Sequence, residues 1–181
     1  MATIHVLDET TINKIAAGEV VERPASVVKE LIENSIDAGA TSIEIEIGEG
    51  GSAYMRITDN GKGMTEEDAR LAVLRHATSK IQSIEDLFDI ASLGFRGEAL
   101  ASIASVSHFV LTTRTVEQDL GTRILIDGGT FTDCIPYGSA PGTTIEVKEL
   151  FFNTPARRKF LKTERTESSK IQDIVGKLAL S

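Results

Sequence analysis

Residues 24–39 are the segment that most constrains what this chain can fold into. On a helix, at ~100° per residue, the apolar side chains of this segment gather into one broad arc that can pack against a sheet. The arc consists of Val27, Val28, Leu31, Ile32, Ser35 and Ile36. Pro24 suits the first turn of a helix and Gly39 suits the position after its end. We therefore predict a helix over residues 24–38 that packs on a sheet.

Three polar residues lie on the flank of this predicted helix. Glu30, Asn34 and Asp37 fall within ~60° of one another, because positions three and four apart stack along a helix. Two carboxylates and an amide at the edge of a buried face can hold a divalent cation and activate a water molecule. The same spacing is common on a solvated polar flank, so the motifs further along the chain have to decide between the two interpretations.

Composition favours one globular domain. The chain has 181 residues, of which 41% are hydrophobic and 25% are charged, an ordinary balance for a domain with a buried core. The net charge of −8 disfavours broad electrostatic adhesion to nucleic acid. The single cysteine excludes an internal disulfide and fits a reducing cytoplasm. No apolar run approaches the ~20 residues of a membrane span, so we expect no membrane contact.

Strand and helix patterns cover most of the remaining chain. Period-two alternation or β-branched runs, separated by turn signals, predict strands over residues 42–47, 53–58, 109–113, 121–126, 131–135 and 144–147. A short strand or arm precedes the first helix, and helical patterns cover residues 8–18, 65–68, 98–105, 156–160 and 166–180. The last pattern reaches Ser181 without a capping signal, so we interpret residues 1–181 as one domain of a longer protein.

A glycine-rich turn follows the second predicted strand. Its sequence is Asp59-Asn60-Gly61-Lys62-Gly63-Met64. Two glycines around one residue permit a tight turn and a close approach of the backbone to a ligand. The carboxylate of Asp59, if buried at the strand end, could accept a hydrogen bond from an exocyclic amine. A plain turn before a helix that Thr65 caps is the alternative.

Residues 75–100 lack a clear period. Irregular segments of this length in a compact domain are usually functional lids or disordered. Gly97 and Glu98 open a short apolar helix whose free N–H groups could face a phosphate, although the glycines could equally be hinges. Neither a Walker A loop nor a Gly-x-Gly-x-x-Gly motif after a strand occurs, so phosphate chemistry would need a different architecture.

Four motifs together resemble those of the GHKL ATPases, which include gyrase B, Hsp90, the histidine kinases and MutL. They are Glu30-x-x-x-Asn34, Asp59-x-Gly61-x-Gly63, the glycine-rich segment 94–97, and Gly142-Thr143 at the start of a late strand. Within this superfamily the chain resembles the N-terminal ATPase domain of the bacterial MutL family of DNA mismatch repair proteins. That resemblance extends over about residues 6–160 and depends on residues 15–24, 33–40, 76–80, 94–100 and 153–160.

The resemblance implies a role for each matching residue. Glu30 resembles the general base that activates the attacking water, and Asn34 resembles the ligand of Mg²⁺. Asp59 resembles the carboxylate that reads adenine, and Thr143 the threonine of the fourth motif, with Thr144 as the less favoured candidate. The residues implied to bind nucleotide, including a lid over the triphosphate, are Asn34, Asp37, Asp59, Gly61, Gly63, Met64, Thr78, Ser79, Lys80, Leu93, Gly94, Phe95, Arg96, Gly97, Glu98, Ala99, Leu100 and Thr143.

The resemblance also implies a fold, cofactors and partners. We expect an α/β (α+β) two-layer sandwich, the GHKL or Bergerat fold, with a mixed, mainly antiparallel sheet covered by helices on one face. The cofactors are ATP and Mg²⁺, and ATP-driven N-terminal dimerisation would signal mismatch recognition. The implied partners are a MutS-type sensor, a downstream nuclease or helicase, DNA and a second copy, in the bacterial cytoplasm. Because a lysine from a following subdomain should reach the γ-phosphate, we expect these 181 residues alone to be weakly active. The resemblance also places a dimerisation region in a C-terminal domain, so we expect these residues alone to be monomeric.

Other interpretations remain open at this point. A kinase-type domain would transfer phosphate to a histidine, but such sites lack a water-activating base in the position of Glu30. A partner-binding domain with vestigial nucleotide binding would be distinguished by its ATP affinity. A local basic run is either a solvated helical face or part of a DNA-facing surface, and consists of Arg157, Arg158, Lys159, Lys162 and Arg165.

Overall fold

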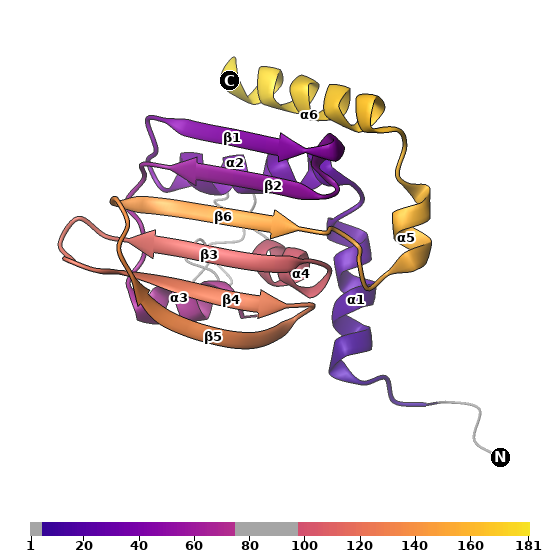
Figure 1. Ribbon diagram of the computed structural model, residues 1–181, viewed down its shortest axis with the longest axis horizontal. Helices are drawn as coiled ribbons and strands as arrows, with labels where there is room; N and C mark the ends of the chain where they lie inside the picture. Colours follow the sequence, from indigo (N-terminus) through magenta and orange to yellow (C-terminus); the bar gives the residue numbers. More distant parts are fainter. Residues whose placement is uncertain (1–4, 75–97) are drawn as a thin grey trace, which may run out of the picture.

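The fold is seen in a computed structural model that describes residues 5–74 and 98–181 (Figure 1). The described helices are α1 (Glu9–Val20), α2 (Pro24–Asp37), the 3₁₀ turn η1 (Glu49–Gly51), α3 (Glu66–Ala72), α4 (Ala99–Ser105), α5 (Pro155–Phe160) and α6 (Glu164–Ala179). The described strands are β1 (Ile43–Gly48), β2 (Tyr54–Asp59), β3 (His108–Arg114), β4 (Gly121–Asp127), β5 (Thr130–Tyr137) and β6 (Gly142–Lys148).

The six described strands form one sheet in the order β1-β2-β6-β3-β4-β5. Every pairing among these strands is antiparallel. The last strand in the chain, β6, therefore lies in the middle of the sheet between β2 and β3. Helices α2, α3 and α4 lie on one face of the sheet, and α6 packs beside α2 (Figure 1). The expected two-layer sandwich with a mainly antiparallel sheet is confirmed.

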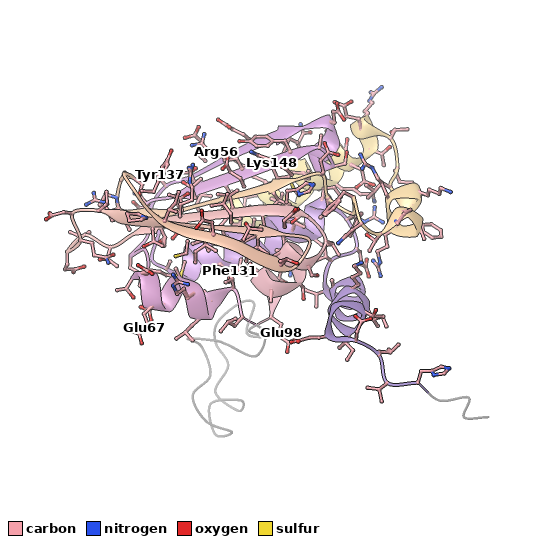
Figure 2. The ribbon with its side chains drawn as sticks, turned by 60° about the horizontal axis from the view of Figure 1, so that its bottom comes forward. Arg56, Glu67, Glu98, Phe131, Tyr137 and Lys148 are labelled. Atoms are coloured by element: carbon pink, nitrogen blue, oxygen red, sulfur yellow. The ribbon has the colours of Figure 1, made fainter. Side chains whose placement is uncertain are left out.

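The hydrophobic core lies between this sheet face and the helices. Apolar side chains alternate along the central strands, and those that face the helices are almost fully buried: Met55, Ile57, Phe109, Leu111, Ile124, Ile126, Ile145 and Val147. The opposite sheet face carries polar side chains. Figure 2 shows Arg56, Tyr137 and Lys148 on that side, away from Glu67 and Glu98 on the helical side.

Helix α2 packs on the sheet largely as the sequence predicts. Five of the six arc residues are buried, namely Val27, Val28, Leu31, Ile32 and Ser35. Ile36 was expected in the same arc but is 40% exposed, because it lies at the margin of the arc in the last turn of the helix. Glu33, by contrast, is only 3% exposed and forms an ion pair with Lys29 at 3.1 Å.

Side-chain caps set the starts of three helices. Asp8 accepts from the backbone N–H of Thr11 and begins α1, which runs two residues past the expected end at Gly18. Thr65 caps the start of α3, as predicted. Thr163 caps the start of α6, whose first residue, Glu164, lies two residues before the predicted start. Residues 5–8 form no strand. Each cap supplies an acceptor to a backbone N–H that the helix itself leaves unpaired.

Arg157, from the basic run, ties α5 to the end of α1. Its guanidinium donates to the backbone carbonyls of Gly18 and Val21. Arg158 pairs with Glu149 at 3.1 Å. Two residues of the basic run therefore make contacts within the chain, and one of them holds α1 in place. Among the helices that the structure describes, none has the length and apolar character needed to cross a bilayer.

Candidate functional site

The covered sheet face turns polar at the end of the sheet where β2 finishes. The strand register aligns Asp59 with Thr143 of β6, Thr143 with Thr113 of β3, and Thr113 with Thr122 of β4. Residues directly opposite one another on paired strands share a face. The next row on this face is apolar and consists of Ile57, Ile145, Leu111 and Ile124. The hydrophobic core therefore ends in a row of one carboxylate and three hydroxyls.

Asp59 is the charged member of this row and is 9% exposed. One carboxylate oxygen accepts from Ser35 Oγ at 2.8 Å, and the other accepts from the backbone N–H of Gly61 at 2.8 Å. A buried carboxylate needs such donors, because desolvation of the charge is costly. An ionised carboxylate has about four lone-pair sites, so Asp59 retains capacity to accept from a ligand. From the sequence, Ser35 was expected only to pack in the apolar arc, although a hydroxyl within such an arc is a signal of a polar contact.

Gly63 and Gly142 allow the turn after β2 to lie against the ends of two other strands. Gly63 has φ +67°, and a Cβ there would lie 1.9 Å from the carbonyl oxygen of Arg114. Gly142 has φ +123°, and a Cβ there would lie 2.1 Å from the carbonyl oxygen of Asp59. Both positions combine a left-handed backbone with direct backbone contact, so only glycine fits. The two glycines bring the turn, β3 and β6 together around Asp59.

Replacing Gly63 with alanine should lower the free energy of unfolding by about 2–4 kcal/mol, because it adds backbone strain and a clash with backbone atoms. Chemical denaturation would measure this change. Gly138→Ala is the matched control, since a Cβ there would meet nothing within 4 Å. Equal stability of the two variants would contradict the tight packing of the turn.

Thr143 and Thr144 lie on opposite faces of the sheet. Thr143 Oγ1 is 2.9 Å from Thr113 Oγ1, on the covered face beside Asp59. Thr144 Oγ1 donates to Thr58 Oγ1 at 3.2 Å, on the open face. Of the two threonines considered from the sequence, only Thr143 shares a sheet face with Asp59.

Glu30, Asn34 and Asp37 lie along one flank of α2. Glu30 and Asn34 are half-buried and Asp37 is exposed, and each of them has a polar or electrostatic partner. Asn34 is adjacent in sequence to Ser35, which hydrogen-bonds Asp59, so Asn34 is on the turn of α2 nearest that carboxylate. Glu30 is one turn nearer the start of the helix, about 6 Å along its axis.

Glu30 also borders an open cavity between α2 and α6. The cavity has a volume of about 410 Å³, and its other lining residues include Glu22, Ser26, Lys29, Lys170 and Ile174. A space of this size admits several water molecules. Glu30 is therefore a half-buried carboxylate that water can approach.

Comparison with known proteins identifies the family to which this arrangement belongs. Residues 22–127 match the family model described as "Histidine kinase-, DNA gyrase B-, and HSP90-like ATPase". The chain belongs to this ATPase family. The matched segment contains Glu30, Asn34, Asp59 and the glycine turn, so the family assignment and the site geometry concern the same residues.

Individual members of the family with high similarity are MutL proteins. The DNA mismatch repair protein MutL of Caldanaerobacter subterraneus subsp. tengcongensis is 60% identical over 181 residues, which are 100% of this chain and 31% of that protein. MutL of Xanthomonas axonopodis pv. citri is 60% identical over 178 residues, covering 98% of this chain and 28% of that protein. The chain thus spans under a third of the length of these relatives.

A solved structure of the same family has a similar fold. It is the Aquifex aeolicus MutL ATPase domain complexed with ADP, with a TM-score of 0.69 and 38% sequence identity. The match covers 89% of this chain and 56% of that one. The expected resemblance to MutL proteins is confirmed by sequence and by structure.

Part of the expected ATPase site lies outside the described residues. The predicted lid residues Thr78, Ser79, Lys80, Leu93, Gly94, Phe95, Arg96 and Gly97 are in this group. Glu98 occupies the N-cap position of α4 without a side-chain capping bond, Ala99 is buried in its first turn, and Leu100 packs against the core. Met64 is half-buried, also packs against the core, and donates its backbone N–H to Thr113 Oγ1 at 2.9 Å.

The described residues of the candidate site fit a magnesium ion that a bound nucleotide helps to hold. Among the described residues, no group of three or more His, Cys, Asp or Glu side chains could hold a metal ion. Asn34 offers one amide oxygen. Mg²⁺ commonly takes one or two ligands from the protein and the others from phosphates and water. Asn34 therefore suits an ion held mainly by phosphates.

Cys134 of β5 does not fit a catalytic role. Burial raises the pKa of its thiol, and the nearby Glu66 carboxylate raises it further, whereas Arg70 lowers it. The thiolate is the nucleophilic form of cysteine, so a raised pKa makes the side chain less reactive at neutral pH.

Proposed function

We propose that this chain is the ATP-binding switch domain of a bacterial DNA mismatch repair protein, and that it binds ATP with Mg²⁺ and hydrolyses it slowly. The observation that carries the proposal is the buried Asp59, which accepts from Ser35 and Gly61 and retains acceptor capacity beside Thr143. A buried carboxylate with spare lone pairs is suited to a ligand that carries an amine.

The adenine base would bind at the polar row. Its exocyclic amine would donate to Asp59, and its ring would lie against the backbone of the turn at Gly61 and Gly63. Glycine at these positions lets the turn pack closely against Ala38 and the ends of β3 and β6, which keeps its backbone beside Asp59. The match to an ATPase family and the ADP complex of the Aquifex aeolicus relative support this assignment.

The triphosphate would extend along the flank of α2. Asn34 would hold Mg²⁺, which supplies charge neutralisation at the phosphates when it is bound. Glu30 would orient a water molecule for attack on the terminal phosphate and would accept a proton from that water molecule. Residues 78–80 and 93–100 would cover the phosphates and exclude bulk water. Asp37, at the end of the same flank, would contribute to the surroundings of the nucleotide.

The biological role follows from the relatives. MutL proteins that are 60% identical over this segment are DNA mismatch repair proteins. We therefore assign this chain to the same process, in the bacterial cytoplasm. ATP binding would favour pairing of two N-terminal domains, and the closed pair would signal to a MutS-type sensor and to a downstream nuclease or helicase on DNA.

Calorimetric titration with a non-hydrolysable ATP analogue, with and without Mg²⁺, tests the proposal. We expect saturable one-site binding that Mg²⁺ strengthens, because the ion would link Asn34 to the phosphates. A titration of the full-length protein under the same conditions is the parallel measurement. Failure of both proteins to bind the analogue would refute the assigned function.

A further inference from the structure

The hydroxyl of Thr113 makes three polar contacts at the centre of the polar row. Thr113 is 1% exposed. Its Oγ1 accepts from the backbone N–H of Met64 at 2.9 Å, lies 3.1 Å from the carbonyl oxygen of Gly142, and lies 2.9 Å from Thr143 Oγ1. One side chain of β3 therefore connects the turn after β2 with the first two residues of β6.

The three contacts fix the direction of each hydrogen bond. A hydroxyl donates one hydrogen bond and accepts up to two. The carbonyl of Gly142 can only accept, so Thr113 must donate its proton there, and the N–H of Met64 can only donate. For the third contact to be a hydrogen bond as well, Thr143 must donate to Thr113. If Thr113 instead donated its proton to Thr143, the carbonyl of Gly142 would receive no hydrogen bond from Thr113.

This direction determines what Thr143 presents to a ligand. Once its proton is committed to Thr113, the oxygen of Thr143 can only accept further hydrogen bonds. Thr143 lies directly opposite Asp59 in the register, with Cβ atoms about 5 Å apart on the same sheet face. Asp59 is also an acceptor. Both groups at this end of the site then favour a ligand edge that donates hydrogen bonds.

We propose that Thr113 is a positioning residue that fixes Thr143 as an acceptor and thereby makes the site select 6-amino purines over 6-oxo purines. The inference rests on the proposed function, since it concerns the same nucleotide site. A 6-amino group supplies donors to this edge of the site. A 6-oxo group supplies an acceptor, which would face two further acceptors, and such mismatches of buried polar groups are strongly disfavoured.

The test compares the binding of ATP with that of inosine triphosphate, whose base carries an oxo group at position 6 and an N1–H where adenine has an unprotonated N1. Thr113→Val keeps the shape of the side chain but removes the hydroxyl. Thr143 is then free to rotate and donate its proton to the oxo group. We expect the ratio of the two dissociation constants, ITP over ATP, to fall by about 10-fold, the change that corresponds to one buried hydrogen bond. Thr113→Ser should retain the wild-type ratio.

Two further variants complete the experiment. Thr144→Val removes a hydroxyl that contacts Thr58 on the open face of the same strand and should leave the ratio unchanged. Thr143→Val removes the acceptor itself and should lower the ratio as Thr113→Val does. This second variant tests the inference even if Thr113→Val fails to fold. An unchanged ratio in folded Thr113→Val or in Thr143→Val would overturn the inference. A wild-type protein that binds neither nucleotide would instead refute the proposed function.

Discussion

Replacing Asp59 with asparagine should weaken ATP binding on the order of 100-fold while the protein stays folded. The fold should survive because asparagine has the same shape and can satisfy the same neighbours. Its carbonyl can accept from the N–H of Gly61, and its amide can donate to Ser35 Oγ. Ser35 can then donate its own proton to the carbonyl of Leu31, which is 3.0 Å away.

The loss of affinity comes from the contact with the ligand. A hydrogen bond to a charged group contributes roughly 1.5–3 kcal/mol, and the new amide would also direct a donor at the amine of the base. A total of about 3 kcal/mol corresponds to a roughly 100-fold change in the dissociation constant. Calorimetry on the wild-type and variant proteins would measure it.

Asp133→Asn is the matched control for this substitution. Asp133 is exposed on β5, and its carboxylate accepts from the backbone N–H of Cys134 at 2.8 Å. This variant should bind ATP as the wild-type protein does. Thermal melting without nucleotide would show whether Asp59→Asn is folded. If a folded Asp59→Asn variant bound ATP with wild-type affinity, Asp59 would not be a nucleotide contact.

The elements of the fold that depend on local pattern could be predicted from the sequence. Helix α2 follows from the 3.6-residue spacing of its apolar side chains, and β2 follows from the alternation that buries Met55 and Ile57. The exceptions are also physical. Ile36 belongs to the apolar arc but lies at its margin, where it remains exposed. Glu33 is polar but buried beside Lys29, and helical spacing alone does not foresee that.

The order of the strands could not be predicted, and part of the candidate site depends on it. Because β6 inserts between β2 and β3, Thr143 lies between Asp59 and Thr113. These residues are far apart in the sequence, and only the register of the finished sheet aligns them. Pairs within one element, such as Glu30 and Asn34, were recognisable from their spacing. Thr113 carried no such local signal.

Replacing Glu30 with glutamine should reduce ATP hydrolysis by about 10²–10⁴-fold and change ATP affinity little. The range is the usual contribution of a positioned general base. Glutamine keeps the size of the side chain and can still form hydrogen bonds, but its amide cannot accept a proton from water. If Glu30 acts on the attacking water, it stabilises the transition state much more than bound ATP.

Glu22→Gln is the matched control for Glu30→Gln. Glu22 lines the same cavity between α2 and α6 and is exposed. Its replacement changes the net charge by the same amount and should leave turnover near the wild-type value. Steady-state phosphate release from the full-length protein would measure turnover, and calorimetry with the non-hydrolysable analogue would measure affinity.

The two site substitutions therefore have opposite expected signatures. Asp59→Asn should lose affinity, and Glu30→Gln should lose turnover at nearly constant affinity, because one residue would contact the base and the other the attacking water. If Glu30→Gln weakened binding as strongly as Asp59→Asn, Glu30 would belong to the binding contacts. If it hydrolysed ATP at the wild-type rate, another group would have to activate the water.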